Sequence, residues 1–453
     1  MSVDTRPTTT SGSGTASPTR TRPITAVVAG SLAAGALTAL VLVLVVFPGA
    51  TEAVITGSML LGFAFGWTLL AALSTRMTSR AQRWAAVPAV VMGTAGLALL
   101  ILSPGDATLT AVGWIWPPVM VALVVWTFVQ ARRHLRGLGR WMVTLVLVFL
   151  AAASVGATTE NVTLVREHGA YPAPGQTYEV AGHRLHLDCR GQGGPTVVLF
   201  NGLGEFSGSW ARITDEVGTT TRVCAYDRPG QGWSEEAGSP QDGVTAAQDL
   251  HLLLAAAGEE APYVLVGHST GGTYALNYAA RYPEQVAGMV LLDSSSPDQF
   301  TVVTKYAGQY PLMRRGLALF PTVARLGVNR ALATSGLPGD AGQVARVMTT
   351  APRAFRNGRD EVTMIPEVFE QAQALTTLQD RPLVVLTASE NLTNPGWIAA
   401  QDKLATLSTD HLHRTVDATH EGLLEDEPGA TESVLAITEV LSAVRTGSLL
   451  AAP

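Results

Sequence analysis

The five residues Gly-His-Ser-Thr-Gly at 267–271 fit the pattern Gly-x-Ser-x-Gly. They follow the short apolar run 263–267 and open a helical pattern over 270–282. A strand that turns this sharply into a helix holds its serine in a strained backbone conformation with the hydroxyl exposed. The residues two before and two after it approach too closely for side chains. We therefore expect Ser269 to be a nucleophile.

A nucleophilic serine needs a base that accepts its proton and returns it to the leaving group. Three histidines follow Ser269 in the chain, His411, His413 and His420. Only His420 lies in a loop between a strand-like segment, 413–418, and a final helix. We expect His420 to be the base and the other two to be ordinary surface residues. His268 lies within the serine turn and is expected to pack there.

Four further segments, taken together, resemble the α/β-hydrolase family in content and in order. They are Phe-Asn-Gly-Leu-Gly at 200–204, Tyr-Asp-Arg-Pro-Gly-Gln-Gly-Trp-Ser at 226–234, Leu-Leu-Asp-Ser-Ser-Ser at 291–296 and Ala-Thr-His-Glu-Gly at 418–422. The resemblance covers roughly residues 176–445. It implies a mostly parallel sheet with helices on both faces and a helical cap over the site.

The resemblance implies an acid that orients His420, and it leaves two positions for it. The common position follows the apolar run 382–387, where Glu390 stands near the place of the usual aspartate. Some family members instead supply the acid directly after the preceding strand, where Asp293 stands. We favour Asp293 and keep Glu390 as the alternative acid.

The resemblance also implies an oxyanion hole made by two backbone N–H groups, those of Thr270 and Leu203, with Gly204 as the alternative to Leu203. Asn201 replaces the histidine that is common in this loop. The turn at 227–232 is expected to be structural rather than catalytic, because Asp and Gly suit tight backbone geometry. The fold needs no metal and no organic cofactor for this chemistry.

The elements that must position these residues alternate between short apolar runs and helical patterns. The apolar runs are 196–202, 221–227, 263–267, 288–293 and 382–387, and the helical patterns are 243–257, 270–282 and 431–445. This alternation predicts a mostly parallel sheet covered on both faces, with the site at the carboxyl ends of its strands. Residues 298–380 contain no strand-like run and are interpreted as the cap.

The first third of the chain has a different composition. Five uncharged apolar runs follow each other at 24–47, 53–74, 84–103, 109–130 and 141–157. A membrane-spanning helix needs about 20 apolar residues, with a lower limit of about 17. The sequence therefore predicts a disordered tail (1–23), a five-helix transmembrane region (24–157), a linker (158–175), the hydrolase-like domain (176–445) and a short tail (446–453).

The loops of this region alternate between arginine-rich and arginine-free. The positive-inside rule then places the N-terminus in the cytoplasm and everything after residue 157 outside. Because no ionisable residue lies within the five runs, an anchor is favoured over a transport pathway. Cys189 and Cys224 lie on strands that are neighbours in the family's sheet, so a disulfide is expected between them in this compartment.

The chain is thus interpreted as a membrane-anchored serine hydrolase that cleaves a carboxylic ester, with lipid esters among the candidates. A peptidase or an acyltransferase would use the same residues, and a non-catalytic membrane receptor or interaction module is the alternative from another class. The net charge of −6 argues against a nucleic-acid partner. The expected partners are the ester substrate and membrane lipids, and the sequence indicates no protein partner.

Overall fold

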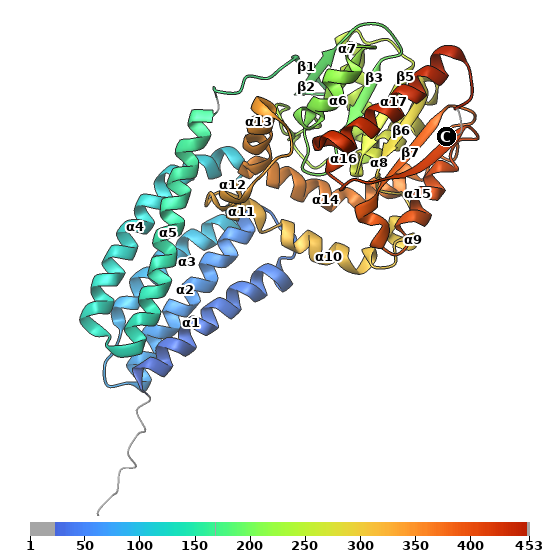
Figure 1. The fold of residues 1–453 in the computed structure, drawn as a ribbon. Coiled ribbons are helices and arrows are strands. Elements are labelled where there is room, and N and C mark those ends of the chain that lie inside the picture. The colour runs from blue at the N-terminus through green and yellow to red at the C-terminus, as the bar shows by residue number, and fades with distance from the viewer. Residues whose placement is uncertain (1–22, 168, 451–453) are drawn as a thin grey trace, which may run out of the picture.

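The computed structural model describes residues 23–167 and 169–450, and its first part is a bundle of long helices (Figure 1). These are α1 (Ile24–Val41), α2 (Glu52–Met77), α3 (Ala86–Leu102), α4 (Asp106–His134) and α5 (Gly137–Glu167). Five helices, counted with the short turns that extend α1 and precede α3, are long and apolar enough to cross a membrane, as predicted. The predicted disordered tail 1–23 lies outside the described residues except for Pro23, as do the last three residues of the predicted tail 446–453.

Small residues let the bundle helices approach closely. A side chain at Gly62 of α2 would lie 2.6 Å from the backbone nitrogen of Ala39 in α1. Gly35 of α1 meets α2 in the same way, because its Cβ would lie 2.9 Å from the Gly62 carbonyl oxygen. Such contacts are typical of helices that pack in a membrane, where van der Waals contact replaces the hydrophobic driving force.

Helix α5 is longer than its apolar run. The run ends at residue 157, whereas the helix continues through Glu167. The predicted linker at 158–175 is therefore helical over its first ten residues. Hydropathy does not detect this extension because the segment Thr-Thr-Glu-Asn-Val-Thr-Leu-Val-Arg-Glu is mostly polar.

The second part of the chain contains an eight-stranded sheet in the order β1-β2-β4-β3-β5-β6-β7-β8. The strands are β1 (Gln176–Val180), β2 (His183–Arg190), β3 (Val197–Phe200), β4 (Val223–Tyr226), β5 (Tyr263–His268), β6 (Val286–Leu292), β7 (Leu383–Ala388) and β8 (His411–Val416). The pairs from β4 to β8 are all parallel, and only β1 and β2 are antiparallel to their neighbours. The predicted mostly parallel sheet is confirmed.

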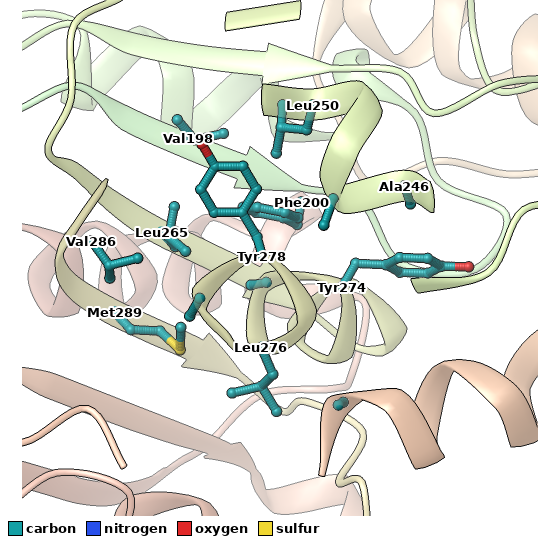
Figure 2. Packing of buried hydrophobic residues seen from close by; sticks show 14 of the residues in the cluster. Val198, Phe200, Ala246, Leu250, Leu265, Tyr274, Leu276, Tyr278, Val286 and Met289 are labelled. Carbon is teal, nitrogen blue, oxygen red and sulfur yellow. The ribbon is translucent and has the colours of Figure 1, made fainter. Parts of the chain in front are cut away.

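Helices cover both faces of this sheet. On one face lie α6 (Ala211–Val217) and α17 (Glu427–Thr446), and on the other lie α7 (Gly243–Ala257) and α8 (Thr270–Arg281). Successive strand residues alternate between the two cores, as Val197 and Val198 do. Figure 2 shows Leu265 and Met289 of the strands packed around Tyr278 of α8. Each fully buried aliphatic side chain stabilises the fold by about 1.5–3 kcal/mol.

Between β6 and β7, all the regular elements are helices. They are α9 (Gln299–Val302), α10 (Tyr306–Leu317), α11 (Phe320–Ala324), α12 (Val328–Leu332), α13 (Gly339–Thr350) and α14 (Pro352–Ala372). This is the segment interpreted as a cap, and we refer to residues 298–380 as the cap. Figure 1 shows α11 and α12 against the end of the bundle, with α14 running beneath the sheet.

The two cysteines lie opposite each other at the antiparallel edge of the sheet. Cys189 of β2 pairs with Cys224 of β4 in the strand register. Their sulfur atoms are bonded at 2.06 Å. This disulfide joins the antiparallel hairpin of β1 and β2 covalently to the parallel part of the sheet.

Candidate active site

Ser269 is positioned by the turn between β5 and α8. Its φ of 53° and ψ of −128° place it outside the regions that non-glycine residues normally occupy. Such a backbone conformation costs on the order of 1–3 kcal/mol. Side chains at Gly267 and Gly271 would lie 2.5 Å from the Cα of Gly272 and 2.1 Å from the carbonyl oxygen of Phe200. Only glycine fits at these two positions, as the motif requires.

The structure brings together His420 and Asp293. Asp293 directly follows β6, is fully buried, and approaches Nδ1 of His420 with Oδ2 at 2.6 Å. Its other oxygen, Oδ1, accepts a hydrogen bond from the indole Nε1 of Trp397 at 2.8 Å. Burial alone would raise the pKa of Asp293, but the bonds from His420, Trp397 and Asn391 outweigh it and lower the pKa. Asp293 is therefore an ionised acceptor that fixes the orientation of the imidazole.

The alternative acid, Glu390, has a different role in this geometry. Its Oε2 accepts a hydrogen bond from the backbone N–H of His420 at 2.7 Å. The residue after it, Asn391, stands where the common acid is expected and donates from Nδ2 to Oδ2 of Asp293. Glu390 thus holds the backbone of the histidine loop, whereas Asp293 holds the imidazole ring.

A second acid–base pair lies between the serine turn and the histidine loop. His268 is fully buried, and its Nε2 donates to the carbonyl oxygen of His420 at 2.9 Å. Its Nδ1 contacts Oε1 of Glu205. A carbonyl oxygen only accepts, so Nε2 of His268 carries a proton. An ionised Glu205 also only accepts, so Nδ1 must then carry a proton as well. Burial opposes both charges, yet their mutual attraction lowers the pKa of Glu205 and raises that of His268. The pair is therefore an imidazolium–carboxylate pair.

Glu205 also holds the loop after β3. Its Oε2 accepts a hydrogen bond from the backbone N–H of Gly202 at 2.5 Å. A side chain at Gly202 would lie only 2.9 Å from Cβ of Ser269, so this loop touches the serine. Glu205 therefore connects three parts of the site: the Gly202 loop, the serine turn through His268, and through it the His420 loop. No sequence motif marks Glu205, and the position of His268 within the serine turn predicts only that it packs there.

Substituting Glu205 by glutamine is expected to lower the free energy of unfolding by about 3 kcal/mol, because it leaves a buried imidazole without its counter-charge. The carboxylate form stabilises the fold above about pH 4.5, the ordinary pKa of a glutamate. The imidazolium form stabilises it fully below about pH 6.5, and this contribution is lost as the pH rises through the raised pKa of His268. The stability lost in Glu205→Gln should therefore be largest between about pH 4.5 and about pH 6.5.

Thermal unfolding of the purified protein across this pH range measures the effect. Glu216→Gln is a matched control, because Glu216 is an exposed residue of α6. A Glu205→Gln deficit that grows steadily above pH 8 would contradict the assignment of an ion pair.

The two expected oxyanion donors lie beside one narrow cavity. Thr270 opens α8, so its backbone N–H has no partner within the helix. Leu203 lies in the loop after β3. The cavity is a gap without room for a water molecule, and it is lined by Leu203, Thr270, Thr273, Tyr274, Glu361, Ile365, Val368 and Phe369. Four of these residues belong to α14, so the cap forms one wall of the site.

Buried polar contacts hold the loop that contains Leu203. Asn201, which replaces the common histidine, donates to the Tyr226 carbonyl at 2.8 Å and accepts from the Trp210 indole at 2.8 Å. Arg228 of the turn at 227–232 donates from Nη1 to the Asn201 carbonyl at 2.6 Å. The same guanidinium pairs with Glu361 of α14 at 3.0 Å. Arg228 thus links the Leu203 loop to the cap.

The remaining candidates lie elsewhere. His411 and His413 are on β8, where His411 contacts the Ser408 carbonyl and His413 contacts Asp402. Cys189, Cys224 and Glu259 form the group of ligand-type side chains found among the described residues. Because the two sulfur atoms are bonded to each other, this group is not a metal centre.

A protein of Schizosaccharomyces pombe that is itself uncharacterized is 28% identical over 298 residues, which are 58% of this chain and 55% of that protein. The uncharacterized protein YbdG of Bacillus subtilis is 27% identical over 183 residues, 39% of this chain and 54% of YbdG. The chain therefore spans about half the length of the curated relatives it matches.

Among solved structures, a thermophilic esterase from Thermogutta terrifontis is 20% identical, with a TM-score of 0.44 over 59% of this chain and 99% of that one. A family model described as the alpha/beta hydrolase fold matches residues 195–426. This match covers just over half of the 453 residues and contains the serine turn, Asp293 and His420. The chain belongs to the alpha/beta hydrolase family.

Proposed function

We propose that the chain is a membrane-anchored serine hydrolase that cleaves a carboxylic ester through an acyl-enzyme. The observation that carries this proposal is the strained turn at Ser269 together with the hydrogen bond between the buried Asp293 and the half-buried His420. Two linked features support it: His268, the residue before Ser269, binds the His420 backbone, and the Gly202 loop touches Ser269. The serine, the base and the oxyanion loop are thus held as one unit.

In the proposed reaction the Ser269 hydroxyl oxygen attacks the ester carbonyl carbon while Nε2 of His420 accepts its proton. The negative charge that develops on the carbonyl oxygen is stabilised by the N–H groups of Thr270 and Leu203. The C–O bond to the alcohol then breaks, and His420 returns the proton to the departing alcohol. Water repeats the sequence on the acyl-enzyme, releasing the acid and restoring Ser269.

The residue type at the nucleophile supports ester chemistry within this family. Members with an aspartate at this position form an ester through the aspartate and open epoxides or displace halides, whereas a serine forms an acyl-enzyme. The apolar side chains of Ile365, Val368 and Phe369, which line the gap beside Leu203 and Thr270, favour an ester with an apolar acyl group. A lipid-like ester would be compatible both with these apolar side chains and with the apolar helices of the bundle.

We also propose that the hydrolase domain lies outside the cytoplasm. Arginines occur before α1, between α2 and α3 and between α4 and α5, and the intervening loops lack them. The Cys189–Cys224 disulfide supports this orientation, because disulfides persist in oxidising compartments. In this arrangement the five helices anchor the enzyme at the outer surface of the membrane.

Labelling with a fluorophosphonate probe tests the proposed function. The purified full-length protein is expected to hydrolyse p-nitrophenyl esters, to lose this activity on labelling, and to carry the label on the peptide that contains Ser269. Mass spectrometry of the digested protein identifies that peptide. A non-catalytic receptor or interaction module would show neither turnover nor a label, and a label on another residue would reject Ser269 as the nucleophile.

A further inference from the structure

The cap carries an arginine that is bound entirely by the membrane bundle. Arg325, which follows α11, donates from Nη2 to Asp106 at 2.6 Å and to Glu52 at 3.2 Å. Its Nε also pairs with Glu52, and its Nη1 donates to Thr110 at 3.3 Å. Glu52 and Asp106 are the first residues of α2 and α4, and Glu52 is only 2% exposed. One side chain of the cap thus joins the ends of two bundle helices.

A second arginine of the cap is held by the end of α5. Arg330 of α12 donates from Nε and Nη2 to the two carboxylate oxygens of Glu160, at 3.0 and 2.9 Å. Its Nη1 donates to Glu167 at 2.9 Å. A two-point contact between a planar guanidinium and a carboxylate fixes orientation as well as distance. Glu160 is 2% exposed, so its charge depends on this arginine for compensation.

Backbone and apolar contacts also join the cap to the bundle. A side chain at Gly156 of α5 would lie 2.3 Å from the carbonyl oxygen of Leu326, so the cap backbone rests directly on the bundle backbone. Ala318 of the cap is buried against Val43 and Ile55 of the bundle. We call this interface, with Arg325, Arg330 and their carboxylate partners at its centre, the bundle–cap clasp.

The clasp is connected to the wall of the active site through α14. Arg356 of α14 also pairs with Asp106, at 3.1 Å. The ring of Phe355 in α14 stacks on Phe320 of α11 with centroids 5.6 Å apart. Further along the same helix, Glu361 and Phe369 line the cavity beside Thr270 and Leu203. Helix α14 thus runs from the bundle to the residues proposed as oxyanion donors, Thr270 and Leu203.

From these contacts we infer that the membrane bundle positions the substrate-binding cap, and that Arg325 is a positioning residue for the substrate cavity. The substrate side of this inference rests on the proposed function. A paired guanidinium and carboxylate taken out of water are costly to separate, so the clasp holds α14 in one place. Breaking it leaves Ser269 and His420 untouched but frees the wall that an acyl group must contact.

The test uses the full-length protein and two esters, one with a small acyl group and one with a long acyl group. Arg325→Glu is expected to raise KM for the long ester by about tenfold, because like charges now face each other at Glu52 and Asp106. The kcat for the small ester should stay within about threefold of the original. Arg315→Glu, an exposed arginine of α10, is the matched control and should change neither value.

Rescue by a charge swap separates positioning from a general loss of structure. In the double variant Glu52→Arg/Arg325→Glu the pair is re-formed in reverse, and Asp106 keeps Arg356 as its partner. KM for the long ester is expected to return to within about threefold of the original value. Should Arg325→Glu fail to fold, Glu52→Gln breaks the same ion pair from the bundle side with little change in shape. It is expected to raise KM for the long ester in the same direction.

Limited proteolysis distinguishes a failed clasp from a failed enzyme assignment. New cleavage within the cap is expected in Arg325→Glu and protection is expected in the double variant. If the unaltered protein shows neither turnover nor a label on Ser269, the proposed function is wrong, and the cleavage pattern alone decides the clasp. If the protein is active but Arg325→Glu changes neither KM for the long ester nor the cleavage of the cap, the inference is overturned.

Discussion

Substituting Ser269 by alanine is expected to reduce ester turnover by a factor on the order of 10⁶ and to abolish fluorophosphonate labelling. The alanine has no oxygen to attack the carbonyl carbon, so His420 has no proton to accept and no acyl-enzyme forms. The remaining groups, the two oxyanion donors and the cavity, retain only a small acceleration over water. Turnover of a p-nitrophenyl ester by the purified protein, with labelling as the second measurement, checks the result.

The fold should survive this substitution, because the hydroxyl of Ser269 forms no bond on which the turn depends. The backbone N–H of Ser269 is held by the Leu292 carbonyl at 3.1 Å, and its own carbonyl is held by the N–H of Ser295 at 2.9 Å. Ser442→Ala is a suitable control, since Ser442 is an exposed residue of α17. Turnover by the Ser269→Ala variant at more than about one hundredth of the original rate would show that another residue performs the attack.

The serine turn could be predicted from sequence because its requirements are local. A strand, two glycines at fixed spacing and a helix all lie within twenty residues, and each is needed to place Ser269 where it is. The order of the later motifs then indicated His420, since only one histidine stands in a loop before the last helix. The same reasoning left two acids, because both Asp293 and Glu390 follow strands that are adjacent in the sheet.

The two acids differ in contacts that no local pattern contains. Asp293 receives its hydrogen bonds from residues up to 127 positions away in the chain. The role of Glu205 could not be predicted from local sequence for the same reason, since its partner His268 lies 63 residues further on. A glutamate in the loop after a strand, together with a histidine inside Gly-x-Ser-x-Gly, is the sequence signal that could have indicated this pair.

The bundle shows the same division between local and distant information. Length and hydropathy predicted its five helices, because a membrane span has to be apolar over its whole length. They did not predict the polar end of α5, where Glu160 and Glu167 are stabilised by Arg330, more than 160 residues away in the chain. Nor could they relate Glu52 to Arg325, which are separated by 273 positions.

Asp293→Asn is expected to lower kcat by about 10⁴-fold, whereas Glu390→Gln should cost less than about tenfold. Asp293 accepts hydrogen bonds from the indole of Trp397, the amide of Asn391 and the imidazole of His420, so both of its oxygens face donors. An asparagine turns an NH₂ group toward one of these donors. If that donor is His420, the imidazole is forced into the wrong tautomer and can no longer take the Ser269 proton.

Glu390→Gln keeps an oxygen that can accept the backbone N–H of His420, the one bond that this side chain makes to the histidine. The imidazole and its partner Asp293 are then unchanged. Comparison of kcat for one ester in the two variants, at equal labelling of properly folded protein, decides between the two acids. A large loss in Glu390→Gln with near-normal turnover in Asp293→Asn would make Glu390 the acid, and the bond between Asp293 and His420 would then serve the loop rather than the proton transfer.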